Sequence, residues 1–330
     1  MKRFFKRALI VIAGICLSTM LIVSIMYQKA RNNYTQQLES ASQIMKTNKG
    51  PIEYVTMGDN QSAYRHLLVL HGTPGGYDAG VLVANWLNLD DDTHVIIPSR
   101  PGYLRTPIEV GITPAAAADA MIALLDELKV EKVTVLGWSG GGPTAVELAQ
   151  RHPGRVANLI LLSARIMSDG KYRFESTDKS DDPFDPNIVD VSADFFGPDF
   201  KAFAKILGLD AMPDFLVYRF FPEGITHMDL TVERLRQLAP TTQPPSRRNI
   251  GRHNDYWQFA SLPEKPRIKI GSRTLLIYSN SDVSVGIAHG YYMNKAIPHS
   301  ELLIVENESH FSVLTPEISE KVRQFLTHEK

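Results

Sequence analysis

Cysteine is almost missing from this chain of 330 residues, in which Cys16 is the single one. No disulfide can therefore form within the chain, and its folded part depends on a hydrophobic core alone. Cysteine pairs and the histidine–glutamate spacings of metal ligands are missing too, so we expect neither a metal nor another cofactor. Excess charge of one sign is absent as well, because 35 basic residues oppose 36 acidic ones. This balance gives no reason to expect nucleic acid as a partner.

Charged residues are also missing from one long stretch, Ala8 to Tyr27. A stretch of about 20 apolar residues can cross a bilayer as a helix. Lys2, Arg3, Lys6 and Arg7 precede it, and such positive charge marks the cytoplasmic side of a membrane. We therefore predict a single-pass anchor in the cell membrane over residues 1–27, with the following domain outside the cytoplasm. A cleaved signal peptide is the alternative, but no Ala-x-Ala cleavage site closes the stretch.

Strands and helices alternate through most of the remaining chain. Residues 28–50 are polar and are predicted to form a stalk, and the folded domain is predicted over 51–330. Strands are predicted at 51–56, 67–71, 94–98, 132–136 and 157–163, with two more beginning near 273 and 301. Helices are predicted over 113–129, with Thr113 as N-cap and Pro114 behind it, and over 316–326. This order predicts an α/β fold with a mostly parallel sheet.

The most informative motif is G-x-S-x-G at residues 137–141, between the strand at 132–136 and a predicted helix at 143–149. In this context the motif is typical of a nucleophile elbow, a sharp turn that lifts a serine hydroxyl to the edge of the sheet. Glycines allow the strand and the helix to approach each other. Ser139 is therefore the predicted nucleophile, and Trp138 beside it is a candidate substrate-binding residue.

A second loop, Gly72 to Gly76, follows the strand at 67–71. Acyl transfer passes through a tetrahedral oxyanion, which two preorganised N–H donors stabilise. The N–H groups of Gly140 and Thr73 are the predicted donors. His71 is expected to shape this loop rather than to act as a base. An ordinary turn at the end of a strand is the alternative for the loop taken by itself.

Asp282 and His310 are the predicted acid and base. Asp282 follows the strand that begins near 273, and His310 lies between the last strand and the last helix. The acid would hold the imidazole in the productive tautomer and stabilise its cation. Asp282 as a helix cap, and Asp169 as a rival acid, are the alternatives.

These motifs make the chain resemble the α/β-hydrolase superfamily, in which the nucleophile, acid and base follow in this chain order. The turn at 99–103 is also similar to the R-P-G-Y/F-G turn of many members, with Leu104 in place of the last glycine. The resemblance implies an eight-stranded sheet flanked by helices, and a helical cap inserted at 165–262 over the active site. A serine at position 139 argues against epoxide hydrolases and haloalkane dehalogenases, which resemble this fold but use an aspartate there.

The sequence thus predicts a membrane-anchored serine hydrolase that forms an acyl-enzyme on small carboxylic ester or lipid-like acyl substrates. The loop at 71–76 is similar to that of proline iminopeptidases, and an aminopeptidase of that type is one alternative. An acyltransferase, which would use the same residues, is another. A non-catalytic ligand-binding module on the same fold is the alternative of another class. The complete set of Ser, Asp and His favours an enzyme over that module.

Overall fold

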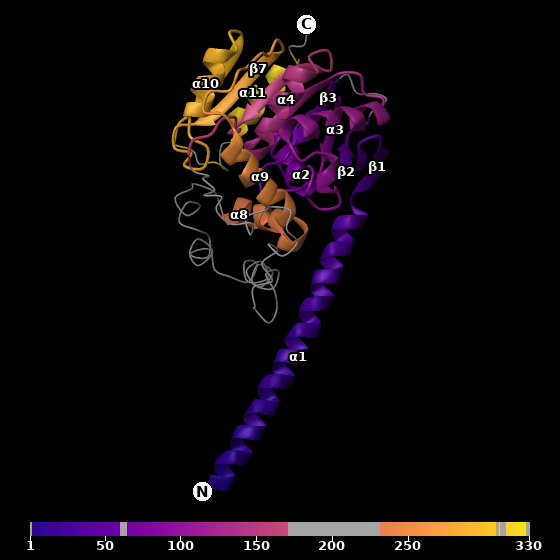
Figure 1. Ribbon diagram of the computed structural model, residues 1–330, viewed down its shortest axis with the longest axis vertical. Helices are drawn as coiled ribbons and strands as arrows, with labels where there is room; N and C mark the ends of the chain where they lie inside the picture. Colours follow the sequence, from indigo (N-terminus) through magenta and orange to yellow (C-terminus); the bar gives the residue numbers. More distant parts are fainter. Residues whose placement is uncertain (1, 60–64, 171–231, 308–309, 311–314, 328–330) are drawn as a thin grey trace.

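A twisted sheet lies at the centre of the folded part of the molecule (Figure 1). The computed structural model describes residues 2–59, 65–170, 232–307, 310 and 315–327. Its strands are β1 (Gln43–Thr47), β2 (Gly50–Met57), β3 (Arg65–Leu70), β4 (Thr93–Pro98), β5 (Val133–Trp138), β6 (Val156–Leu162), β7 (Arg273–Ser279) and β8 (Ser300–Val305). They form one 8-stranded sheet in the order β1-β2-β4-β3-β5-β6-β7-β8. β2 is antiparallel to both of its neighbours and all other pairs are parallel, which confirms the predicted mostly parallel sheet.

Helices cover both faces of this sheet. The helices are α1 (Lys2–Ser40), α2 (Tyr77–Leu87), α3 (Pro114–Glu127), α4 (Gly142–Arg151), α8 (Val232–Leu238), α9 (Asn249–Ser261), α10 (Ala288–Ala296) and α11 (Pro316–Thr327). Buried residues of α3, α4 and α10 pack on one face, and those of α2 and α11 pack on the other. A parallel sheet covered on both faces consists of nearly continuous apolar strands, which is why its strands were readable in the sequence.

Successive residues of β3 show how one strand serves two cores. Leu68 and Leu70 belong to the cluster under α3 and α4, whereas Leu67 and Val69 belong to the cluster under α2 and α11. All four side chains are fully buried. Each contributes roughly 1.5–3 kcal/mol relative to an exposed side chain. The two cores fix the strand ends from which the site is built.

The sheet begins earlier than the sequence predicts, because residues 43–47 of the expected stalk form the edge strand β1. The end of α1 also contacts the domain. The Tyr34 hydroxyl donates to the Pro240 carbonyl at 2.8 Å, and the Tyr77 hydroxyl donates to the Leu38 carbonyl at 2.6 Å. Edge strands carry polar side chains that face water, so the composition of β1 hid its strand character.

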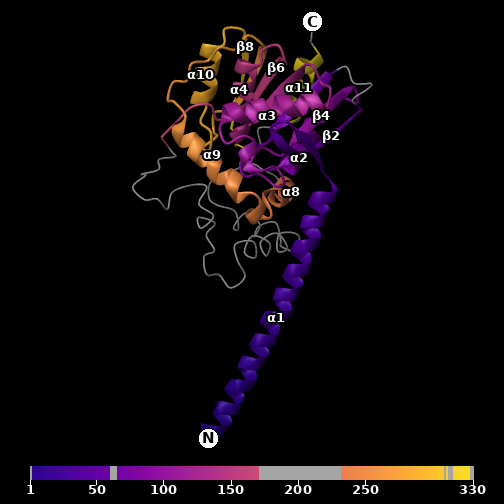
Figure 2. The same cartoon turned by 45° about the vertical axis from the view of Figure 1, so that its right-hand side comes forward.

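α1 is one helix of 39 residues that projects from the domain in Figures 1 and 2. Within the described residues, none of the helices combines the length and the hydropathy that a bilayer crossing requires. The predicted membrane anchor over residues 1–27 therefore has no support in the described helices. The location outside the cytoplasm rested on that anchor and stays a prediction.

The helix predicted at 113–129 is α3, and its predicted cap is confirmed. The Thr113 hydroxyl accepts the N–H of Ala116 at 3.1 Å, and Pro114 is the first helical residue. The last helix, α11, also matches its prediction. Of the predicted cap at 165–262, residues 171–231 lie outside the described residues, and the cap as a whole stays a prediction. Both overall views place α8 and α9 at the same end of the sheet (Figures 1 and 2).

Candidate active site

Ser139 lies at the carboxyl end of β5, in the turn that leads into α4. Its φ of +50° lies in the left-handed region, which costs a non-glycine residue roughly 1–2 kcal/mol. Close packing holds it there. A Cβ on Gly137 would stand 2.6 Å from the Cβ of Ala145, and one on Gly141 would clash with the Leu70 carbonyl oxygen. The glycines thus let β5 and α4 approach, and the result is the strand–turn–helix geometry of a nucleophile elbow.

The structure brings Ser139, Asp282 and His310 together from the carboxyl ends of β5, β7 and β8 in the same sheet. Ser139 Oγ lies 2.8 Å from His310 Nε2, and His310 Nδ1 lies 2.7 Å from Asp282 Oδ2. The imidazole and the carboxylate are both buried. When Nδ1–H is donated to the carboxylate, Nε2 holds the lone pair that can accept the serine proton.

Backbone N–H groups hold the Asp282 carboxylate in place. Its Oδ1 accepts from the N–H of Ser284 at 2.8 Å and from that of Val285 at 2.9 Å. Burial acts to raise the pKa of Asp282, but His310 and these two N–H groups outweigh it and keep the pKa below its usual range. Asp169, the alternative acid, instead pairs with Arg165 at 3.0 Å. Asp282 is therefore the acid that the geometry favours.

Thr73 and Gly140, whose N–H groups are the predicted oxyanion donors, lie against each other. A Cβ on Gly140 would clash with Thr73 Oγ1 and would stand 3.1 Å from Phe259 Cζ. A Cβ on Gly72 would stand 3.1 Å from Ser139 Cβ. The loop after β3 therefore passes directly over the elbow because both glycines lack side chains. The donor role of the two N–H groups stays a prediction.

His71 is fully buried, and both of its ring nitrogens are engaged. Nδ1 lies 2.8 Å from the Gly72 carbonyl oxygen, and Nε2 accepts the N–H of Arg100 at 2.9 Å. Burial, and then the Arg100 charge, hold the pKa of His71 well below its usual value. A neutral histidine with two fixed partners shapes the loop, as the sequence predicts.

Trp138 packs in the core beneath the site, with 4% of its surface exposed. Its indole stacks beside the His310 imidazole, with 6.4 Å between ring centroids. A small cavity next to Gly140 is lined by Phe259, Ile112 and Asn254, among others, and Trp138 is not part of its wall. The indole thus supports the imidazole from the core side, and its role in substrate binding stays a prediction.

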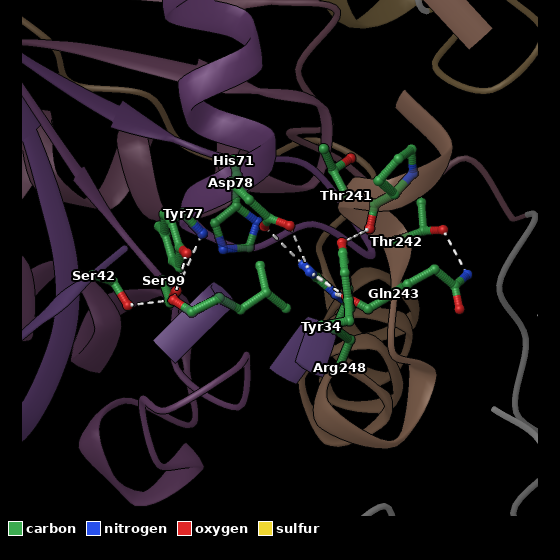
Figure 3. Close-up of polar contacts among 12 residues, drawn as sticks. Tyr34, Ser42, His71, Tyr77, Asp78, Ser99, Thr241, Thr242, Gln243 and Arg248 are labelled. Carbon is green, nitrogen blue, oxygen red and sulfur yellow. Dashed lines mark hydrogen bonds and ion pairs between the residues drawn. The ribbon is translucent and has the colours of Figure 1, made fainter. Parts of the chain in front are cut away.

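Two buried ion pairs that the sequence analysis missed tie α9 to the rest of the domain. Asp255 of α9 pairs with Arg100 at 2.6 Å. Arg248, directly before α9, pairs with Asp78 of α2 at 2.6 Å, as Figure 3 shows. A buried charge is costly unless it is paired, so both pairs fix this helix over the site. Little in the sequence indicated these two ion pairs, because Asp255 and Arg248 lie in the part of the chain without a strand–helix pattern.

The turn after β4 keeps its shape despite the departure at Leu104. Leu104 has a φ of +51°, in the left-handed region where the resembled turn has glycine. Its N–H donates to the Arg247 carbonyl at 2.8 Å. Gly102, with a φ of +84°, lies so close to Gly251 of α9 that an added Cβ would stand 2.7 Å away. The turn therefore packs directly under α9.

The fold and the arrangement of these strand ends define a class of protein. The chain belongs to the alpha/beta hydrolase fold family, whose model matches residues 65–317. Among solved structures, an alpha/beta hydrolase fold protein from Nakamurella multipartita is 28% identical, with a TM-score of 0.67, and the match covers 86% of this chain and 98% of that one. An esterase from Exiguobacterium antarcticum is 17% identical, with a TM-score of 0.58 over 86% of this chain and 98% of its own, and shows the shared fold alone.

Sequence relatives match over shorter segments. The uncharacterized hydrolase YcgS of Bacillus subtilis is 36% identical over 121 residues, which are 35% of this chain and 38% of that protein. A pimeloyl-[acyl-carrier protein] methyl ester esterase of Aromatoleum aromaticum is 42% identical over 96 residues, which are 29% of this chain and 36% of that protein. The matched segments thus span little more than a third of each of these relatives.

Proposed function

We propose that this chain is a serine esterase that hydrolyses carboxylic esters through an acyl-enzyme on Ser139. The observation that carries the proposal is the hydrogen-bond chain from Asp282 through His310 to Ser139, with lengths of 2.7 and 2.8 Å. A buried carboxylate behind an imidazole that faces a strained serine is the arrangement that activates a hydroxyl nucleophile.

In the first half-reaction, His310 Nε2 takes the proton of Ser139 while Oγ attacks the ester carbonyl carbon. The oxyanion that forms accepts hydrogen bonds from the N–H groups of Gly140 and Thr73. The intermediate collapses, the C–O bond to the alcohol breaks, and the imidazolium returns its proton to the alcohol oxygen. In the second half-reaction, His310 deprotonates a water that attacks the acyl carbon and restores the serine hydroxyl.

Esters are preferred over amides as substrates for two reasons. A relative that is 42% identical over 96 residues is a pimeloyl-[acyl-carrier protein] methyl ester esterase. The cavity beside Gly140 is lined by Phe259 and Ile112 among others. Among its described lining residues, Asp255 is the only acidic one, and it is paired with Arg100. A free amino terminus, which an aminopeptidase must bind, finds no unpaired carboxylate in this described wall.

The test is turnover of matched ester and anilide substrates by the purified full chain. We expect p-nitrophenyl butyrate to be hydrolysed and the corresponding anilide to be spared. Ser139→Ala should lower kcat by roughly 10⁴-fold or more if the three residues act as a unit. Ser261→Ala, at an exposed serine of α9, is the matched control and should keep wild-type turnover. Wild-type activity in Ser139→Ala would refute the proposal. Anilide turnover equal to ester turnover would instead indicate a peptidase.

A further inference from the structure

Asp255 is a buried carboxylate of α9 that receives hydrogen bonds from three side chains, in the loop after β3 and the turn after β4. The Arg100 guanidinium donates to both of its oxygens, at 2.9 and 2.6 Å. The Tyr103 hydroxyl donates to Oδ2 at 2.5 Å, and the Thr73 hydroxyl donates to the same oxygen. Only 5% of the Asp255 surface is exposed. Nothing in the proposed acyl transfer uses this carboxylate directly.

The Thr73 contact distinguishes Asp255 from an ordinary structural ion pair. The Thr73 side chain is confined between Gly140, which leaves no room for a Cβ, and the Asp255 carboxylate. Threonine has few accessible χ1 states, so fixing Oγ1 also restricts the orientation of its backbone. The same backbone carries the N–H that is the predicted oxyanion donor.

The other side of the loop is held by the same network. The Arg100 Nε donates to the His71 carbonyl at 2.8 Å, two residues before Thr73. Arg100 and Asp255 together therefore clamp the loop from the carbonyl of His71 to the hydroxyl of Thr73. An oxyanion donor is effective only when it lies within a few tenths of an ångström of its productive position, since a misplacement of about 1 Å can cost roughly 100-fold in rate.

We propose that Asp255 is a positioning residue that holds the Thr73 N–H in the oxyanion hole, an inference that rests on the esterase function proposed above. Asp255 belongs to α9, and its hydrogen bond to Thr73 is the contact through which this helix acts on the oxyanion hole. The clamp acts on the transition state, in which negative charge develops on the carbonyl oxygen, rather than on bound substrate.

The first part of the test removes each end of the Thr73–Asp255 hydrogen bond in the full chain. Thr73→Val deletes the hydroxyl and keeps the branched shape, whereas Thr73→Ser keeps the hydroxyl. Asp255→Ala deletes the acceptor. For p-nitrophenyl butyrate we expect Thr73→Val and Asp255→Ala to lower kcat roughly 10- to 100-fold with KM nearly unchanged, and Thr73→Ser to stay near wild type. Phenylboronic acid, whose tetrahedral adduct resembles the oxyanion, should bind the two impaired variants more weakly by a similar factor.

The second part separates positioning from folding. Asp78→Ala is the matched control, because it also removes the carboxylate partner of a buried arginine between α9 and the domain, without a contact to Thr73 in the described network. We expect it to lower Tm as Asp255→Ala does and to leave kcat within about 3-fold of wild type. The double variant Thr73→Val with Asp255→Ala should have a kcat no lower than that of the less active single variant, because either substitution alone already removes the Thr73–Asp255 hydrogen bond.

Four results would contradict the positioning role of Asp255 or the proposed function. Fully multiplicative losses in the double variant, or wild-type kcat in Thr73→Val, would overturn the positioning role while leaving the esterase intact. An equal loss of kcat in Asp78→Ala would assign the effect to the seating of α9 in general and would also overturn it. A wild-type chain without ester turnover would instead remove the proposed function and this inference together.

Discussion

Asp282→Asn is the substitution whose consequence the structure defines most sharply. Asp282 Oδ1 accepts two backbone N–H groups, and Oδ2 faces His310 Nδ1 at 2.7 Å. An asparagine of the same shape must place its single oxygen toward the two N–H donors of Ser284 and Val285, because its NH₂ group cannot accept them. The amide NH₂ then points at His310 Nδ1.

This orientation reverses the tautomer of the base. Nδ1 must accept from the amide, so the ring proton moves to Nε2, which then cannot take the proton of Ser139. For an acid–base–serine system, forcing the wrong tautomer lowers kcat by about 10⁴-fold, which corresponds to about 5.5 kcal/mol in the activation free energy. The backbone bonds are retained, so the variant should fold normally.

The assay is steady-state hydrolysis of p-nitrophenyl butyrate at pH 7, with Tm measured by circular dichroism on the same samples. Asp169→Asn, which alters the alternative acid, is the control and should keep more than a tenth of the wild-type kcat. A kcat for Asp282→Asn within 10-fold of wild type, in a folded sample, would refute the tautomer argument.

Three further predictions concern the scaffold of the site. Gly141→Ala places a Cβ against the carbonyl oxygens of Leu70 and His71, so it should lower turnover and should lower the unfolding free energy by roughly 1–3 kcal/mol or more. The unfolding free energy is measured by urea titration. Gly154→Ala is the control, because a Cβ there meets no neighbouring atom, and it should match wild type. Leu161→Ala should lower the unfolding free energy by about 2–5 kcal/mol, because this side chain is fully buried under α4, and a loss below 1 kcal/mol would contradict the packing described. The pKa of Asp282 is lowered in the folded state, so ionised Asp282 stabilises the fold above the unfolded pKa of about 3.9, and this stabilisation is lost as the pH falls through the folded pKa. Wild type should therefore lose more unfolding free energy between about pH 6 and pH 3 than Asp282→Asn does. Equal losses in the two proteins would contradict the lowered pKa.

The sheet and the residues gathered at its strand ends were largely predictable from the sequence, because buried parallel strands are continuous apolar runs. Ser139 and His310 were predicted from their positions after such strands, and their side chains lie 2.8 Å apart in the structure. β1 was missed because an exposed edge strand carries polar residues. The anchor prediction lacks support because a run without charge predicts a helix and does not fix its surroundings. Asp255 was missed because its meaning depends on a contact with Thr73, 182 positions away in the chain.

Labelling by a fluorophosphonate probe shows directly whether Ser139 is an activated nucleophile, because only a serine activated by a neighbouring base reacts with the probe at neutral pH. The full chain is incubated with the probe, digested and mapped by mass spectrometry, with Ser139→Ala and the Ser261→Ala control alongside. We predict a single adduct on Ser139 in wild type and in Ser261→Ala, and none in Ser139→Ala. A folded wild-type chain that stays unlabelled, or an adduct on another serine, would contradict the assignment of Ser139 as the nucleophile.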